Sequence, residues 1–297
     1  MPMEAKLPAR LGVAIMMVAA ACFATNHVAA RIAFDHGTAV ATAVTVRAAV
    51  TALFLLALMR MQGVRIAFQR GTLPRLALIG LLVAVQSYCL SSAVAMIPAA
   101  LALLVFQTCP LLFVLLSWAS GKERPRPGVM FAIPLALVGL ALALDIRFGQ
   151  LAQRWADIGA GVTWAFGAAL SYSIVLFANA HWIKGVDGRL RTFVMTSVTA
   201  TVVLVAAGAA GAHALPADGL GWLGLAILSV FYCAAMTTLF LTLPRLEGAS
   251  GTVALNFEPI AVLGLAWIFL GQAVSPSQIA GAFLVVAAIV WLGWARR

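Results

Sequence analysis

Long apolar stretches recur along this chain, and short polar or charged breaks separate them. Each stretch contains about 20 residues, which is the length that a helix needs to cross a bilayer at 1.5 Å per residue. The stretches lack the polar and apolar alternation of barrel strands, and hydrocarbon requires every backbone group to be paired within its own segment. The pattern therefore predicts membrane-spanning helices.

Ten such spans are predicted, and the short loops between them place neighbouring helices antiparallel. In residue numbers the spans are 11–30, 39–58, 73–92, 99–118, 127–144, 159–179, 191–210, 219–241, 251–270 and 278–294. The first stretch is too long for a signal peptide and ends in polar residues, so it is interpreted as a retained first helix.

Composition supports a bilayer as the solvent of this chain. It is 64% hydrophobic and 9% charged over 297 residues, whereas soluble domains carry roughly 25% charged residues. The net charge of +10 comes from loop residues and forms no basic stripe with interleaved aromatics, which argues against a nucleic-acid partner. The four cysteines lie inside apolar spans without metal-ligand spacing, so neither a metal site nor a cofactor is expected.

The distribution of Lys and Arg predicts the orientation. Taking the loops alternately, 15 of the 19 Lys and Arg residues fall on the side of the N-terminus, three fall on the other side, and Arg47 lies inside the second span. The positive-inside rule then places both termini in the cytoplasm. We expect a multi-pass protein of a bacterial cytoplasmic (inner) membrane.

The two halves of the chain resemble each other. A shift of 149 residues without gaps superposes several residues of matching type, namely Pro110 on Pro259, Trp118 on Trp267, Pro127 on Pro276 and Gln107 on Asn256. Five spans per half is an odd number, so the second half enters the membrane from the opposite face. The sequence thus predicts an all-α membrane protein of two inverted repeats, 1–148 and 149–297, an architecture in which substrate binds near the midplane.

Three motifs resemble the EamA branch of the drug/metabolite transporter superfamily over nearly the whole chain. The first comprises Phe23, Asn26, Ala29, Gly37 and Arg47; the second comprises Ala99, Leu103, Pro110, Leu111, Leu112 and Glu123; the third comprises Ala254, Asn256, Glu258, Pro259, Leu270, Gly271, Gln272, Gln278 and Gly281. Gln272 departs from the glutamate that is usual in that family. The resemblance implies ten helices and export or uptake of small organic solutes, without naming one.

Two ionisable residues inside spans are candidates for coupling or ion pairing, because a charge in hydrocarbon usually faces a cavity or a partner. Glu258 directly precedes Pro259, which loosens the helix and frees backbone carbonyls there. Glu258 either binds a cationic substrate group, exchanges a proton, or bonds to a neighbouring helix or to Arg47. Arg47 either holds a substrate carboxylate, pairs with an acidic residue, or reaches the interface; structural pairing is the favoured interpretation.

Aromatic and amide residues inside the spans are the remaining candidates for substrate binding. The three tyrosines, Tyr88, Tyr172 and Tyr232, lie within spans three, six and eight, where a phenol needs a partner. They line a cavity for a zwitterion or aromatic metabolite, or else form interhelical hydrogen bonds. The amides and the one tryptophan that serve equally as ties, anchors or cavity lining are Asn26, Gln86, Gln107, Asn256 and Trp164.

The resulting hypothesis is a secondary transporter that exports amino acids or related compounds by alternating access, with a small molecule and the lipid bilayer as its partners. Small residues in spans five and ten, including Gly139 and Gly281, make these two helices the expected scaffold or dimer contact, so the chain is either a monomer or a homodimer. A passive facilitator remains open, as does a carrier of a drug, nucleobase, sugar or vitamin. An intramembrane enzyme is disfavoured because the histidines and acidic residues are scattered.

Overall fold

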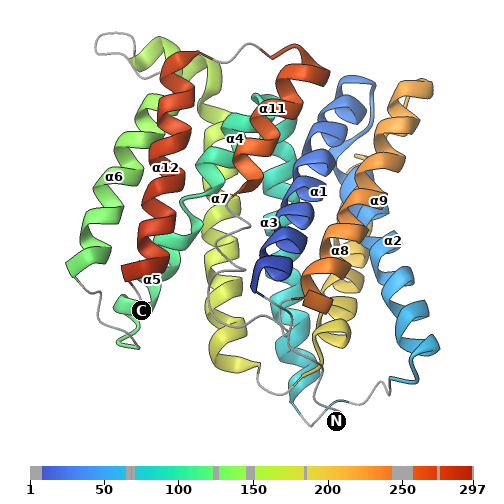
Figure 1. The fold of residues 1–297 in the computed structure, drawn as a ribbon. Coiled ribbons are helices and arrows are strands. Elements are labelled where there is room, and N and C mark those ends of the chain that lie inside the picture. The colour runs from blue at the N-terminus through green and yellow to red at the C-terminus, as the bar shows by residue number, and fades with distance from the viewer. Residues whose placement is uncertain are drawn as a thin grey trace.

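The computed structural model describes residues 9–64, 68, 71–122, 127–144, 151–183, 186–242, 257–272 and 275–295, and it is helical throughout these ranges apart from short connections. Figure 1 shows the helices side by side in one bundle. The helices are α1 (Ala9–Asp35), α2 (Val40–Met61), α3 (Thr72–Met96), α4 (Ala99–Phe106), α5 (Cys109–Ala119), α6 (Pro127–Ala143), α7 (Leu151–Trp182), α8 (Gly188–Ala210), α9 (Gly219–Thr242), α11 (Glu258–Leu270) and α12 (Pro276–Ala295).

Seven stretches of the described helices are long and apolar enough to cross a membrane, counting α4 and α5 as one span. Three shorter apolar helices belong to α6, α11 and α12. The chain is therefore an all-helical, multi-pass membrane protein. The count of ten spans and the cytoplasmic placement of both termini stay predictions.

The first helix extends further than the sequence pattern predicts. The expected span 11–30 stops before Arg31, but α1 continues to Asp35 and places Arg31 within its last turns. Gly37 then ends the helix with a φ of +87°, which a residue without a Cβ adopts at no steric cost. The charged residues stay helical because both find partners there.

The predicted fourth span is broken into two helices at Gln107 and Thr108. Pro110 has no N–H to donate to the carbonyl of Phe106. The N–H of Leu111 donates to the carbonyl of Thr108 and not to that of Gln107. Two carbonyls therefore lack their usual helical donors at this point.

The helix α11 begins in the matching way in the second half. Glu258 is its first residue, and Pro259 occupies the second position, just as Cys109 and Pro110 begin α5. The shift of 149 residues places these two starts on each other. Both repeats thus begin a new helix before a proline.

The contacts between helices also repeat across the two halves. Helix α1 packs against α9, and α7, the counterpart of α1, packs against α3, the counterpart of α9. Helix α1 contacts α11, while α7 contacts α4 and α5. In two further pairs a helix packs against its own counterpart in the other half: α2 against α8, and α6 against α12. This exchange of partners is what a twofold relation between the halves produces.

Two loops are joined at the end of the bundle where α1 ends and α9 begins. The N–H of Ala39 donates to the carbonyl of Ala214, and the N–H of Ala217 donates to that of His36. His36 Nδ1 also lies 2.6 Å from Asp218 Oδ2. The Gly221 N–H and the His36 imidazole hold the pKa of the Asp218 carboxyl below its usual value.

Helices α6 and α12 lie side by side (Figure 1), and their backbones approach each other closely at Gly139 and Gly281. A Cβ added to Gly281 would lie 2.5 Å from the carbonyl oxygen of Gly139 and would also meet the backbone nitrogen of Ala143. Backbone atoms cannot move aside as a flexible side chain does. The close contact therefore depends on the missing side chain at Gly281.

Gly281→Ala is expected to destabilise the fold by about 1–3 kcal/mol, the usual cost of overpacking. Gly264→Ala is the matched control, because Gly264 lies on α11 and a Cβ there meets nothing within 4 Å. The measurement is thermal unfolding of the detergent-solubilised protein. Equal melting temperatures for the two variants would contradict this account of the α6–α12 contact.

Candidate functional site

A buried arginine lies where α1, α2, α3 and α9 meet. Arg47 of α2 is 4% exposed. Its Nη1 donates to Asn26 Oδ1 at 3.5 Å, and its Nη2 donates to Ser91 Oγ at 3.4 Å. Its guanidinium carbon lies 4.7 Å from the centre of the Tyr232 ring, within range of a cation–π interaction. Four helices thus contribute to the environment of one cation.

In the described part of the chain, the partners of this arginine are all neutral. Among the described residues no carboxylate lies within 4 Å of the Arg47 guanidinium, so the favoured pairing with an acidic residue is not found there. A guanidinium has five N–H donors, and its two hydrogen bonds here are long. An isolated charge in a low-dielectric interior is costly unless an anion accompanies it. The described partners therefore leave the Arg47 guanidinium able to bind an anion.

The amide of Asn26 connects this cluster to the next residue of α1. In one orientation Asn26 Oδ1 accepts from Arg47. In the rotated orientation its nitrogen donates to the carbonyl of Leu228 at 3.2 Å and its oxygen accepts from the N–H of His27 at 3.3 Å. The rotated orientation satisfies both ends of the fully buried amide, whereas the first gives it one long contact with Arg47.

The next residue of α1 contacts a carboxylate. His27 Nε2 is 3.3 Å from Glu258 Oε1, which joins α1 of the first half to the start of α11 in the second. The His27 side chain is 8% exposed and that of Glu258 is 23% exposed. An acidic residue at the first turn of a helix is favoured by the helix dipole. Glu258 therefore bonds to a histidine and, in the described structure, not to Arg47.

The three tyrosines have different environments. Tyr232 is buried over Arg47, and its ring meets the ring of Phe23 edge-on with centroids 6.2 Å apart. Tyr172 contacts Phe106 at the break between α4 and α5, with centroids 5.7 Å apart. Tyr232 thus borders the charged Arg47, whereas Tyr172 borders the break between α4 and α5.

The third tyrosine forms a separate pair with the candidate tryptophan. Tyr88 and Trp164 are 36% and 37% exposed, and their rings meet edge-on with centroids 6.0 Å apart. Trp164 lies well inside α7 and not near a helix start, because α7 begins eight residues before the predicted span. The pair links α3 to α7 away from the Arg47 contacts.

The remaining amides are dispersed. Gln86 of α3 accepts from the neighbouring Ser87 hydroxyl at 3.4 Å. Gln107 is half-buried at the break that ends α4. Asn256, its counterpart in the repeat, lies outside the described residues. Neither described amide contacts Arg47 or Glu258 by hydrogen bond.

Two residues of this cluster were missed by the sequence analysis. His27 was treated as one of several scattered histidines, and Ser91 was not singled out. An ionisable side chain within an apolar stretch was the available signal for His27. No such signal distinguishes Ser91, because small hydroxyls are common in packed membrane helices.

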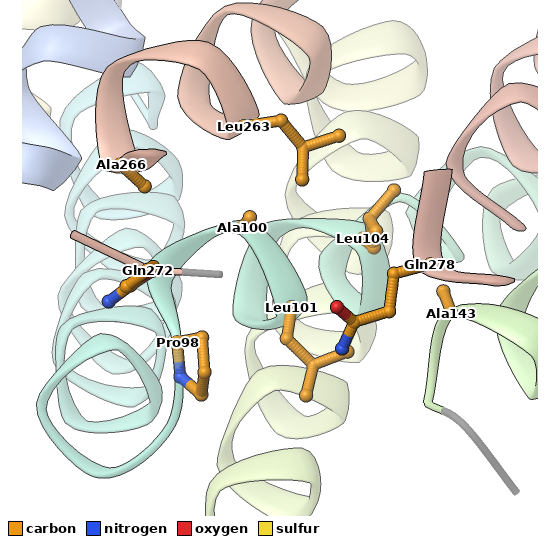
Figure 2. A pocket seen from close by; sticks show the side chains of 9 residues that line it. All are labelled: Pro98, Ala100, Leu101, Leu104, Ala143, Leu263, Ala266, Gln272 and Gln278. Atoms are coloured by element: carbon orange, nitrogen blue, oxygen red, sulfur yellow. The ribbon is translucent and has the colours of Figure 1, made fainter. Parts of the chain in front are cut away.

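A small pocket lies apart from the charged cluster, between α4, α11 and the start of α12. Figure 2 shows the amides of Gln272 and Gln278 among apolar side chains such as Leu101 and Leu263. Its volume of about 40 Å³ suits a few waters and not a metabolite. Gln272 Oε1 is buried there without a partner among the described residues, which such a water would satisfy.

Comparisons with known proteins give a family and a fold. The model of the EamA-like transporter family matches residues 10–144 and 159–294. Curated proteins gave no match. A solved structure described as "Crystal structure of protein" has a TM-score of 0.64 and 20% sequence identity, and the match covers 95% of both chains. At that identity the likeness concerns the fold alone.

Proposed function

We propose that this chain, which belongs to the EamA-like transporter family, is a secondary carrier that exports amino acids or closely related compounds across a bacterial cytoplasmic membrane. The observation that carries the proposal is that two successive residues of α1, Asn26 and His27, contact a buried cation and a half-buried carboxylate. Arg47 is held through Asn26, and Glu258 is held through His27. A zwitterion presents one carboxylate and one ammonium, which these two groups complement.

The placement of these groups favours alternating access as the mechanism. Arg47 and His27 lie in the first half of the chain, whereas Tyr232 and Glu258 lie in the second. A movement of one half against the other therefore changes the contacts of every charged group in the cluster. Inverted-repeat carriers work by such rocking around a fixed central site. The twofold pattern of helix contacts supports the same interpretation.

The break between α4 and α5 also supports a carrier. The broken span between α4 and α5 leaves two backbone carbonyls without their usual helical donors beside Tyr172. Discontinuous helices of this kind supply dipole ends and free carbonyls to solutes near the membrane midplane. A carrier for another metabolite class, or a passive facilitator, is the alternative that the experiment must separate.

The test is counterflow into proteoliposomes loaded with unlabelled amino acid. We expect saturable uptake of radiolabelled zwitterions, with weaker uptake of the corresponding amines and of acids that lack the amino group. Empty liposomes give the background. Uptake that neither saturates nor responds to internal substrate would indicate a facilitator, and exchange of sugars or nucleobases alone would refute the amino-acid assignment.

A further inference from the structure

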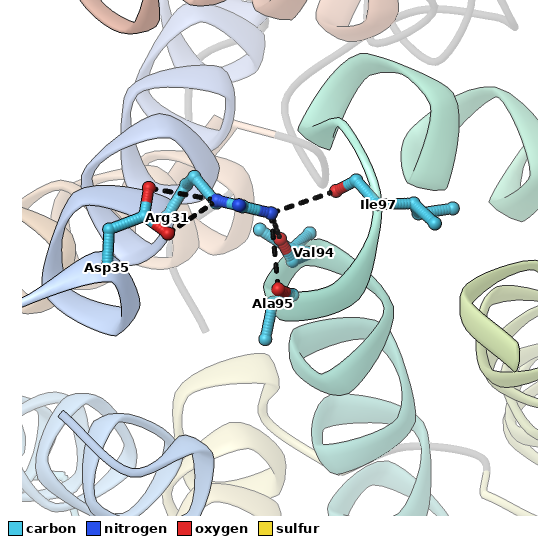
Figure 3. Close-up of polar contacts among 5 residues, drawn as sticks. All are labelled: Arg31, Asp35, Val94, Ala95 and Ile97. Carbon is cyan, nitrogen blue, oxygen red and sulfur yellow. Dashed lines mark hydrogen bonds and ion pairs between the residues drawn. The ribbon is translucent and has the colours of Figure 1, made fainter. Parts of the chain in front are cut away.

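A single arginine ties the end of α3 to α1 at one end of the bundle, which we call the latch face because α1 and α3 both end there. Arg31 Nη1 donates to the carbonyls of Val94 at 3.1 Å, Ala95 at 3.2 Å and Ile97 at 3.4 Å. Its Nε donates to Asp35 one turn later on the same helix, at 3.0 Å. Figure 3 shows the guanidinium between the carboxylate and the three carbonyls.

These carbonyls need a donor from outside their own helix. The last carbonyls of any helix have no intrahelical partner, and they carry the negative end of the helix dipole. Pro98 adds to the shortage of donors, because it lacks the N–H that would otherwise donate to the carbonyl of Val94. Ile97 itself is extended, with φ −128° and ψ 165°. Arg31 thus supplies, from α1, the donors that the junction between α3 and α4 lacks.

The junction is held from the other side by packing against α7. A Cβ added to Gly161 of α7 would lie 2.5 Å from Cγ2 of Ile97, so the Ile97 side chain fills the space that this glycine leaves. Below the junction, Val28, Ala93 and Leu101 belong to one buried apolar cluster. We call this packed contact between α1, α3, α4 and α7 the seam of the latch face. The Arg31 hydrogen bonds lie at the end of the seam.

The second half of the chain has no cation at the position that corresponds to Arg31. The repeat shift of 149 residues places Ala180 at the position of Arg31. Helix α7, the counterpart of α1, therefore carries an alanine where α1 carries the arginine that makes this contact.

We propose that Arg31 is a releasable latch that holds this face closed and that must leave the carbonyls of the α3–α4 junction whenever the face opens. The Arg31 side chain is 23% exposed and that of Asp35 is 48% exposed, so water can take over both sets of hydrogen bonds when the seam parts. Asp35 keeps the guanidinium on α1 in that state. Release therefore leaves no buried charge unpaired.

The test reads opening directly and does not require a known substrate. Val28→Cys, one turn before Arg31, is introduced in a chain whose four native cysteines are alanine, and a membrane-impermeant maleimide is added from either side of the membrane. Arg31→Gln is expected to raise labelling from the latch face by about 10-fold, the equivalent of one charge-assisted hydrogen bond. Arg60→Gln, which removes an exposed cation from the last turn of α2, should leave the rate unchanged.

Two milder variants keep the proposal testable if Arg31→Gln folds poorly. Arg31→Lys retains the charge but not the planar fork, and Asp35→Asn removes only the carboxylate that orients Nε. Both should raise labelling from the latch face by smaller factors. Lowered thermal stability with an unchanged labelling rate in all three variants would show a purely structural cap and would overturn the latch.

Discussion

Replacing Arg47 with glutamine is expected to slow the counterflow of zwitterionic amino acids by about 10- to 100-fold. Charge-assisted hydrogen bonds contribute about 1.5–3 kcal/mol, and 1.4 kcal/mol corresponds to a factor of ten. Arg47 has only Asn26, Ser91 and Tyr232 as partners among the described residues. A substrate carboxylate is the anion that would complete the environment of Arg47. Removing the Arg47 charge should therefore weaken the binding of substrates that carry a carboxylate.

The matched controls separate recognition from folding. Arg60→Gln removes a cation at an exposed position and should leave exchange intact. For Arg47→Gln, exchange of amines that lack a carboxylate should change much less than exchange of the zwitterions. A uniform loss for every solute, together with a lower melting temperature, would instead identify Arg47 as a tie between helices.

Glu258→Gln is expected to raise the apparent KM for amino acids by about tenfold, again because one charge-assisted contact is lost. The amide keeps the shape of the side chain and can still bond to His27, which lies 3.3 Å away. Acids that lack an amino group should be transported by this variant as well as by wild type. The measurement is counterflow with each acid and its α-amino analogue.

An exposed carboxylate provides the control for this second substitution. Asp157→Asn changes the same charge on α7, where the side chain is exposed, and should leave KM unaltered. If Glu258→Gln impaired both solute types equally, the carboxylate would serve the conformational cycle and not the ammonium. If neither solute type were affected, Glu258 would lie outside the substrate path.

The alternatives that the sequence left open for Arg47 and Glu258 show where sequence reasoning reaches its limit. A cation and an anion inside two apolar spans suggested that they pair with each other, since each is costly alone. In the structure Glu258 bonds to His27 and Arg47 has neutral partners. Which side chains face each other depends on how α1, α2 and α11 are rotated about their axes, and weak helical periodicity in an all-apolar segment does not fix that rotation.

Tyr88 and Tyr232 show the same limit for aromatic residues. Both lie within spans of corresponding helices and have a cysteine as the next residue. One is buried over Arg47, while the other is more than a third exposed and contacts Trp164. Similar local sequence therefore did not produce similar surroundings. Neighbours that come from distant helices decide the role of each phenol.

The sequence by itself determined the properties that depend on local composition. Apolar stretches of membrane length fix helices in a bilayer because no other structure there pairs its own backbone, and the prolines at corresponding positions mark where helices begin anew. Only the tertiary structure decided that Arg31 lies within α1 and caps α3, that Glu258 meets His27, and that Arg47 has neutral partners in the described part of the chain. These are contacts between residues far apart in the chain, and their formation depends on the packing of whole helices.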